Sequence, residues 1–419
     1  MRKYQSRNLK KQYDLGQYAP LYRSSILTPL KSQVLPRDKK EPILLDFGPI
    51  LFMVARHFGF CKGVENAIEV AYETLLSHPD KRVFMISELI HNSFVNEDLF
   101  ARGLRFIKTA SGAQLIPWDE ISPDDIVITP AFGATLEDKA QLERIGVEVQ
   151  KYDATCRFVE NVWFRAQELG EQGYSVVIHG KFRHEETQAT LSHSRRHAPT
   201  VVVKNMDEAQ ILGEIIMGQR EAATFYTLFA GKYSEGFSVE RDLERLAVVN
   251  QTTMLASETS EIAEYFRQIM LRKYGEASGD FHIANTRDTL CYATKNNQTA
   301  TLDLLEYPAD FAIVIGGRNS SNTSHLVELC EQHLTTYFIS SERDILSCYA
   351  IRHYDFRTHE ERIVPDYLPL NRPVRVLLTS GASCPDAIVE RVIEKLASCL
   401  PVQRTPEEVV ATALAGALD

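Results

Sequence analysis

One pattern occurs three times in this 419-residue chain and constrains its fold more than any other feature. In each copy an apolar run leads to a cysteine, and apolar residues at helical spacing follow. The three cysteines are Cys61, Cys156 and Cys291. The next apolar run begins 22, 20 and 22 residues later, at Val83, Val176 and Ile313. A repeat of this kind predicts one supersecondary unit used three times.

Polar residues gather after the second apolar run of each copy. His91, His184 and Asn319 lie 30, 28 and 28 residues after the three cysteines. A later apolar run in each copy ends in a second small polar loop, at 131–135, 250–253 and 380–383. Strands that alternate with helices predict parallel sheets with right-handed crossovers, whose ligands bind beyond the carboxyl ends of the strands. We therefore expect three repeated α/β units with parallel sheets around one central cavity.

These repeats predict the organisation of the chain. The α/β units are expected at 51–155, 156–290 and 291–400, after an N-terminal extension (1–50) and before a C-terminal tail (401–419). The apolar runs directly before the cysteines, at 50–54, 147–149 and 281–283, are expected to be strands. Residues 205–244 contain four glycines and are interpreted as a surface insertion in the second unit.

Charge is distributed unevenly between the extension and the rest of the chain. Residues 1–40 contain ten Lys or Arg residues against Asp14 and Asp38, so this segment carries +8 and the remainder −18 of the net −10. We interpret the segment as a partly ordered surface extension; a docking arm for an acidic partner and a transit peptide are the alternatives. The acidic body argues against nucleic acid as the main ligand.

Cysteine usage and hydropathy indicate the compartment. No stretch approaches the roughly 20 consecutive apolar residues of a membrane-spanning helix, and the start lacks the apolar core of a secretory signal. The seven cysteines include no CxxC pair and do not resemble a disulfide framework. We expect a soluble, intracellular protein without a membrane partner. Cys330, Cys348 and Cys399 are interpreted as small buried hydrophobes, and Cys384 beside Ser383 is ambiguous.

The three cysteines at equivalent repeat positions differ from the other four. Three thiolates directed at one point suit a soft metal centre. Zinc would normally require a fourth protein ligand or a water, whereas a [4Fe–4S] cluster held by three cysteines leaves one iron open to a substrate. The repeat therefore favours a cluster over zinc, and burial as a small hydrophobe is the alternative for any one cysteine.

The other residues around the predicted cavity are mostly hydrogen-bond donors, and no cluster of Lys or Arg accompanies them. They include His91, His184, Ser320, Asn322 and Ser383. Helix N-termini at these loops favour a phosphate or diphosphate, although capping is the alternative for each single residue. Glu186 lies in an apolar-flanked turn where burial would raise its pKa and make it a proton donor. Thr252 could relay that proton or orient a water. The alternatives are that Glu186 is an exposed acid in the first turn of a helix and that Thr252 is an N-cap.

Eight motifs in this order resemble the 4-hydroxy-3-methylbut-2-enyl diphosphate reductase family over roughly Leu51 to Leu396. They are Gly59-Phe60-Cys61-Lys62-Gly63-Val64, Ile90-His91-Asn92, Asp153-Ala154-Thr155-Cys156, His184-Glu185-Glu186-Thr187, Asn250-Gln251-Thr252-Thr253, Cys291-Tyr292-Ala293-Thr294, Asn319-Ser320-Ser321-Asn322 and Ser380-Gly381-Ala382-Ser383. The family's enzymes are iron–sulfur oxidoreductases of the last step of the non-mevalonate isoprenoid pathway. The resemblance implies the same reductive dehydroxylation here, giving isopentenyl and dimethylallyl diphosphate.

The resemblance also implies roles for individual residues. A [4Fe–4S] cluster on Cys61, Cys156 and Cys291 would take the substrate hydroxyl at its open iron. The implied diphosphate ligands are His91, His184, Ser320, Ser321, Asn322 and Ser383, with protonation through Glu186 and support from Thr252, which also contacts substrate. Ferredoxin or flavodoxin would supply the electrons, in the cytoplasm or, in a plant or alga, the plastid stroma.

One loop departs from the common bacterial pattern. Many family members have a further diphosphate-binding histidine in a Ser-Ala-His-Gly loop, where this chain has Pro130-Ala131-Phe132-Gly133. The phenylalanine form is similar to that of the cyanobacterial and plant branch, and it leaves one phosphate contact missing or supplied by another residue. The rival interpretations are a quinolinate-synthase-like three-cysteine dehydratase, which needs no electron donor, and a non-catalytic iron–sulfur sensor.

Overall fold

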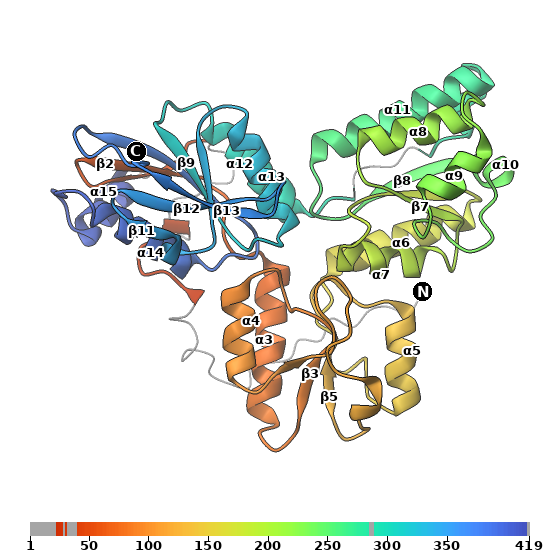
Figure 1. The fold of residues 1–419 in the computed structure, drawn as a ribbon, viewed down its shortest axis with the longest axis horizontal. Helices are drawn as coiled ribbons and strands as arrows, with labels where there is room; N and C mark the ends of the chain where they lie inside the picture. Colours follow the sequence, from red (N-terminus) through yellow and green to blue (C-terminus); the bar gives the residue numbers. More distant parts are fainter. Residues whose placement is uncertain (1–21, 28–29, 32–39, 285–288, 417–419) are drawn as a thin grey trace.

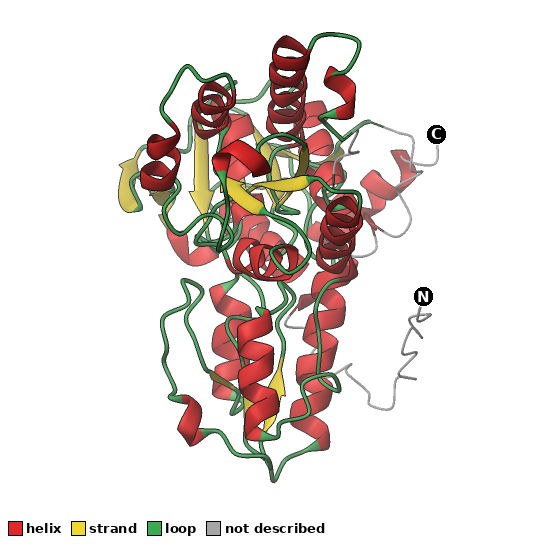
Figure 2. Ribbon diagram, turned by 90° about the vertical axis from the view of Figure 1, so that its right-hand side faces the viewer, coloured by secondary structure: helices red, strands yellow, loops and turns green. Residues whose placement is uncertain are grey.

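The computed structural model describes residues 22–27, 30–31, 40–284 and 289–416. Three lobes, each built on its own sheet, surround a common centre (Figure 1). The view at right angles shows helices arranged around the strands (Figure 2). This arrangement confirms the predicted fold class of repeated α/β units with parallel sheets.

The first lobe has a three-stranded parallel sheet in the order β4-β3-β5. Its strands are β3 (Val83–Met85), β4 (Arg105–Phe106) and β5 (Ile126–Ile128). Its α-helices are α3 (Lys62–Ser77), α4 (Ser93–Ala101) and α5 (Leu136–Ile145). Helix α3 buries Val64, Ala67, Ile68 and Ala71 against this sheet, so the helical spacing after Cys61 produces the expected amphipathic helix.

The second lobe repeats this design with the parallel order β7-β6-β8. The strands are β6 (Ser175–His179), β7 (Thr200–Val203) and β8 (Leu246–Asn250). The helices are α6 (Arg157–Glu171), α7 (Glu185–Ser194), α8 (Met206–Ile216), α9 (Ala222–Leu228), α10 (Val239–Asp242) and α11 (Ala256–Tyr274). Residues 205–244 are not the expected surface excursion, because Phe225 and Phe229 of this segment are buried in one core with β7 and β8.

The third lobe has a five-stranded sheet in the order β1-β2-β14-β9-β10. Its strands are β1 (Ile43–Asp46), β2 (Ile50–Val54), β9 (Phe311–Ile315), β10 (Thr336–Ile339) and β14 (Val374–Ser380), and only β1 is antiparallel to its neighbour. The helices are α12 (Tyr292–Leu304), α13 (Ser321–Glu331), α14 (Asp386–Ala397) and α15 (Pro406–Gly416).

The strand before Cys61 therefore belongs to a different lobe from the one predicted. We expected 50–54 in the first unit, but β2 pairs in parallel with β14 of the third sheet. The runs 147–149 and 281–283 were expected to be strands and are not. Instead, Asp153 bridges to Thr129 at the end of β5, and Ile283 bridges to Leu246 of β8. The segments that lead to Cys156 and Cys291 thus lie beside the last strands of the first and second lobes, and the segment that leads to Cys61 lies beside β14, the last strand of the third lobe.

The described part of the N-terminal extension packs against the body of the protein. Leu27 and Leu30 are fully buried in the core of the third lobe. Lys31 donates to Asp386 Oδ1 at 2.5 Å and to the carbonyl oxygen of Phe58 at 2.7 Å. Tyr22 contacts the ring of Phe60 in the first lobe. The expected surface extension is therefore wrong for these residues, while residues 1–21 lie outside the described part of the chain.

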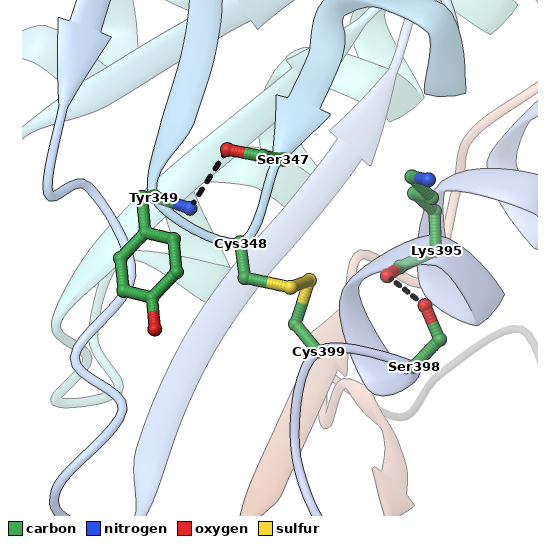
Figure 3. Close-up of a disulfide and its surroundings, with 6 residues drawn as sticks. All are labelled: Ser347, Cys348, Tyr349, Lys395, Ser398 and Cys399. Atoms are coloured by element: carbon green, nitrogen blue, oxygen red, sulfur yellow. Dashed lines mark hydrogen bonds between the residues drawn. A yellow bond between two sulfur atoms is a disulfide. The ribbon is translucent and has the colours of Figure 1, made fainter.

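A second sheet in the third lobe was not predicted. Its antiparallel strands are β11 (Ile345–Ser347), β12 (Ala350–Asp355) and β13 (Glu360–Pro365). Cys348, in the turn between β11 and β12, forms a disulfide with Cys399, just after α14, across 51 residues of sequence (Figure 3). Our interpretation of these two cysteines as separate buried hydrophobes is wrong, because tertiary packing brings them together. Across the described ranges, no helix combines the length and apolar character needed to cross a membrane.

Candidate active site

The three repeat cysteines occupy equivalent backbone positions. Each one is the N-cap residue of a helix: Cys61 of α3, Cys156 of α6 and Cys291 of α12. Their backbone N–H groups donate, in that order, to the carbonyl oxygens of Ala382, Ala131 and Thr252, at 3.2, 3.0 and 3.4 Å. Each acceptor lies in the loop after the last strand of the preceding lobe. These three hydrogen bonds join the lobes in a ring and bring the cysteines together at its centre.

The three thiols open onto one cavity of about 80 Å³. Every predicted site residue lines it: Cys61, His91, Cys156, His184, Glu186, Thr252, Cys291, Ser320, Ser321, Asn322 and Ser383. Gly63 permits the close approach of two cysteines, since a Cβ on this glycine would lie 2.6 Å from Cys156 Sγ and 3.8 Å from Cys61 Sγ. We did not single out Gly63 for this role, although it lies within the motif that contains Cys61.

The thiols are buried and weakly acidic in the protein alone. Burial raises the pKa of Cys156 to about 11 and that of Cys291 to about 12, and it raises the pKa of Cys61 as well. Backbone N–H groups of the first helical turns act in the opposite direction at each sulfur. Three such thiols would become thiolates when a cationic centre binds them.

Four buried polar atoms at the cavity have no hydrogen-bond partner within the described structure. They are His91 Nε2, His184 Nε2, Ser321 Oγ and Asn322 Nδ2. A buried polar group left unsatisfied costs about 1–3 kcal/mol, so four around one cavity indicate a polar ligand. All four can donate a hydrogen bond in at least one protonation state, which suits an anion.

Contacts between loops fix the positions of these donors. Ser320 caps α13 by accepting from the Thr323 N–H at 3.3 Å. Asn322 Oδ1 accepts from the Ala382 N–H at 3.0 Å, which leaves its amide nitrogen free to face the cavity. Ser383 Oγ donates to the carbonyl oxygen of His91 at 3.3 Å and so connects the third lobe to the first. The N-terminus of α13, with its partial positive charge, lies among these groups.

Glu186 is a buried carboxyl with one neighbour that binds both of its oxygens. The Thr252 N–H donates to Oε1 at 2.5 Å, and the Thr252 hydroxyl donates to Oε2 at 2.9 Å. Burial raises the pKa of Glu186 to about 7, while the two hydrogen bonds favour the carboxylate and limit the rise. A carboxyl with this pKa can give up a proton near neutral pH.

Phe132 lies in the loop that lacks the phosphate-binding histidine of the common bacterial pattern. Its ring centroid lies 4.3 Å from that of His91 and 5.4 Å from that of His184, and the two imidazoles are 4.8 Å apart. Burial lowers the pKa of His91 to about 4 and that of His184 well below its ordinary value. Both imidazoles are therefore neutral near pH 7 when no anion is bound.

Several residues near the cavity were not predicted from the sequence. Lys181 is an internal cation whose charge lowers the pKa of both His91 and His184, and burial lowers its own pKa. Its position three residues before His184 was the available signal. On the cysteine side, the ring of Phe158, which lines the cavity, lies 5.0 Å from that of exposed Tyr292. These two rings belong to different lobes, since Phe158 lies on α6 and Tyr292 on α12.

Comparisons with known proteins agree on one family. The model of the LytB protein family matches residues 52–397. A 4-hydroxy-3-methylbut-2-enyl diphosphate reductase of Prochlorococcus marinus (strain MIT 9313) is 38% identical over 367 residues, covering 87% of this chain and 90% of the relative. The reductase of Synechococcus sp. (strain CC9605) is 40% identical over 354 residues, covering 84% and 86%. The solved E-1-hydroxy-2-methyl-but-2-enyl-4-diphosphate reductase of Plasmodium falciparum has 19% identity and a TM-score of 0.59 over 86% of this chain and 97% of its own, a likeness of fold alone.

Proposed function

The chain belongs to the LytB protein family, and from this premise we propose that it is a 4-hydroxy-3-methylbut-2-enyl diphosphate reductase. Two electrons and two protons would remove the hydroxyl group of the substrate as water and give isopentenyl and dimethylallyl diphosphate. The observation that carries this proposal is the meeting of three thiols, one buried carboxyl and four unpartnered polar atoms at a single cavity. The three thiols come from three different lobes, and so do the four unpartnered polar atoms.

Cys61, Cys156 and Cys291 would hold a [4Fe–4S] cluster. All three are free thiols at the start of a helix, and their donor chemistry fits a cluster in which each thiolate binds a different iron. Across the described ranges, no group of three or more His, Cys, Asp or Glu side chains is arranged to hold one metal ion. When bound, such a cluster would pass the electrons of the donor to the substrate and would supply one open iron for its hydroxyl.

The diphosphate would bind to the donors of the third lobe and the histidine pair. Ser320, Ser321 and Asn322 begin helix α13, whose free N–H groups favour an anion. Ser383, His91 and His184 close the other side of the cavity. A diphosphate placed here would satisfy the unpartnered atoms of Ser321, Asn322 and the two imidazoles. Because these donors surround the end of the substrate that does not react, they would orient its allylic hydroxyl toward the cysteines.

Glu186 would provide a proton for the departing hydroxyl or for the reduced allyl fragment. Its pKa of about 7 keeps a large fraction protonated at neutral pH. Thr252 holds both carboxyl oxygens, so the acid has one orientation rather than several rotamers. Thr252 also lines the cavity and would contact the substrate.

We further propose ferredoxin or flavodoxin as the electron donor, in the cytoplasm or, in a plant or alga, the plastid stroma. The unit boundaries 51–155, 156–290 and 291–400 remain a prediction, apart from β2, whose pairing assigns it to the third sheet. In the structure, β1 and α15 also belong to the third lobe, although they lie in the predicted extension 1–50 and tail 401–419.

Anaerobic turnover by the purified, cluster-loaded protein tests the proposed function. With a chemical reductant, the protein should convert 4-hydroxy-3-methylbut-2-enyl diphosphate to the two five-carbon products, in an amount that matches the electrons consumed. No conversion by a protein that retains its cluster and binds the diphosphate would refute the proposal. Consumption of the substrate without any reductant, with a dehydrated but not reduced product, would instead indicate a dehydratase.

A further inference from the structure

The loop that leads to Cys61 lies against the loop that carries Ser383. The Gly59 N–H donates to Ser380 Oγ at 3.0 Å, and the Cys61 N–H donates to the carbonyl oxygen of Ala382 at 3.2 Å. These contacts connect a proposed cluster ligand of the first lobe to a proposed diphosphate donor of the third. The placement of the two loops therefore decides where the diphosphate lies relative to the cluster.

Lys31, in the N-terminal extension, contacts both loops through its ammonium group. Its Nζ donates to the carbonyl oxygen of Phe58 at 2.7 Å and to Asp386 Oδ1 at 2.5 Å. The same nitrogen lies 3.9 Å from the centroid of the Phe58 ring. Phe58 lies three residues before Cys61, and Asp386 lies three residues after Ser383. One side chain from outside the three predicted units thus joins a cysteine loop to a donor loop.

Gly59 allows the Cys61 loop to pass directly beside this ion pair. Its φ is +73°, in the left-handed region that favours glycine. A Cβ at this position would overlap the Asp386 carboxylate and would lie 2.7 Å from Lys31 Nζ. The backbone of the loop and the two charged groups are therefore in direct contact, so a movement of either charged group would displace the loop.

The ion pair is largely buried, and the segment that carries its lysine is anchored. The side chain of Lys31 is 23% exposed and that of Asp386 is 14% exposed. Leu27 and Leu30 are fully buried in the same core as Ile388 of α14, which holds the segment before Lys31 in place. Burial raises the pKa of Asp386, and the Lys31 ammonium opposes this rise. Removal of the lysine would leave a buried carboxylate without its cation, which is costly.

We propose that Lys31 is a positioning residue of the active site: its ammonium joins the Cys61 loop to the start of α14 and thereby fixes Cys61 relative to Ser383. This inference rests on the proposed function for the cluster and the diphosphate. Lys31 precedes the first of the eight motifs, so no motif includes it. Without the ammonium, the Phe58 carbonyl and the Asp386 carboxylate would lose their shared donor, and the two loops would be free to separate.

Lys31→Met tests this role, because methionine keeps an unbranched stem but has no ammonium. The variant is loaded with its cluster anaerobically, and an iron chelator is added while the visible band is followed. Partners that orient metal ligands typically contribute about 10–100-fold to metal affinity or activity, so the band should disappear at least about tenfold faster than in the parent. Calorimetry without reductant should show a Kd for inorganic diphosphate about 2–10-fold higher. A parent-like rate or a parent-like Kd would overturn the inference.

Lys108→Met is the matched control. Lys108 Nζ lies 2.5 Å from Asp138 Oδ1 and 5.4 Å from the centroid of the Trp118 ring, and the side chains of the pair are 20% and 13% exposed. None of these three residues lines the cavity. This variant should lose a similar free energy of unfolding in urea but keep the rate and the Kd of the parent. If it changes both measurements as much as Lys31→Met does, general destabilisation explains them and the inference is wrong.

Alkylation during the chelator treatment locates the change. Released thiols are trapped with iodoacetamide and identified by mass spectrometry of the peptides. In Lys31→Met, Cys61 should be alkylated earlier relative to Cys156 and Cys291 than in the parent, since only its loop has lost a contact. In Lys108→Met the relative rates should equal those of the parent. Unchanged relative rates in Lys31→Met would show that the lysine does not act on Cys61.

Asp386→Asn gives a second test with a smaller disturbance. Asparagine keeps the size and an acceptor for the Lys31 ammonium but loses the charge that strengthens the hydrogen bond. The rate of cluster loss and the Kd should both rise about 2–5-fold. No rise in either would overturn the inference, even where Lys31→Met does not fold.

Turnover is measured separately from these properties. A parent protein that keeps its cluster and binds diphosphate without reducing the substrate would refute only the proposed function. Parent-like cluster retention and affinity in both variants, with normal turnover, would refute only this inference.

Discussion

Thr252 binds both oxygens of the Glu186 carboxyl, through its backbone N–H at 2.5 Å and its hydroxyl at 2.9 Å. The two residues come from different elements of the second lobe, Glu186 from the first turn of α7 and Thr252 from the loop after β8. That loop also accepts the N–H of Cys291 through the carbonyl oxygen of Thr252. One short segment thus orients the acid and holds a cysteine of the proposed cluster.

The first prediction concerns the acid itself. Glu186→Gln should retain iron content and substrate affinity, because glutamine keeps the shape of the side chain. Turnover should fall by about 10²–10⁴-fold, the usual contribution of general acid catalysis. Anaerobic kinetics with one reductant for both proteins measures this loss. Turnover within threefold of the parent would shift the role of acid to Thr252 or to a substrate phosphate.

The second prediction is a pH dependence. If Glu186 acts in its protonated form, as proposed, its pKa of about 7 means that kcat should be high below that pH and fall about tenfold per unit well above it. In Thr252→Val the hydroxyl that favours the carboxylate is lost, so the pKa of Glu186 should rise and the fall in kcat should move to higher pH. A profile of kcat against pH for both proteins checks this. A shift to lower pH in Thr252→Val would contradict the assignment.

The third prediction separates the cysteines by position. Serine at Cys61, Cys156 or Cys291 should destroy or deplete the cluster, because hydroxyl groups bind iron far more weakly than thiolates. Cys330→Ser is the matched control: Cys330 is a buried free thiol, as Cys291 is, but it lies in the core of the third lobe and does not line the cavity. Iron content and the visible absorption band are the measurements. A normal cluster in Cys156→Ser would exclude a centre shared by three lobes.

Periodicity and spacing in the sequence were sufficient to predict the three units and the residues around the cavity. Strand ends in repeated α/β units fall at constant offsets from the cysteines, so His91, His184 and Ser320 could be placed at one end of their sheets. The sequence pattern does not reveal which strand a given strand pairs with. The run 50–54 has the same apolar pattern whichever sheet it joins, and only the parallel register with β14 assigns it to the third lobe.

Long-range partners also explain the other differences. Nothing in the spacing of Cys348 and Cys399 reveals their disulfide, because it depends on how the β11–β12 turn packs on the end of α14. The free Nε2 of His184 follows from the hydrogen bond between its Nδ1 and the Glu186 N–H, a contact that no motif encodes. In the sequence, Phe132 stands where a phosphate-binding histidine is missing, and only the structure reveals its contact with both imidazoles.

The fourth prediction concerns the disulfide. It closes a 51-residue separation, and cross-links of this length stabilise proteins by about 2–4 kcal/mol. Under oxidising conditions, Cys348→Ser should lower the free energy of unfolding by about that amount. With dithiothreitol, which reduces the bond in the parent, the difference should nearly vanish. Urea denaturation under both conditions measures this, and an equal difference in both would mean that lost packing is responsible.

The last prediction separates the two parts of the N-terminal extension by truncation. Deleting residues 1–21 removes five basic residues and Asp14 but none of the described contacts. Turnover with a small chemical reductant should stay nearly unchanged, while turnover with an acidic ferredoxin should slow, more so at low salt, where electrostatic steering is least screened.

Deleting residues 1–40 should have a larger effect, because it also removes two fully buried leucines and the Lys31 contacts to Asp386 and Phe58. Loss of one buried leucine side chain costs about 2–5 kcal/mol, so this protein should be strongly destabilised. The carbonyl of Phe58 lies three residues before Cys61, and cluster content should fall as that loop loses its anchor. Both reductants should then give low turnover. A 1–40 deletion as stable and active as the 1–21 deletion would show that the buried segment makes no net contribution to the fold.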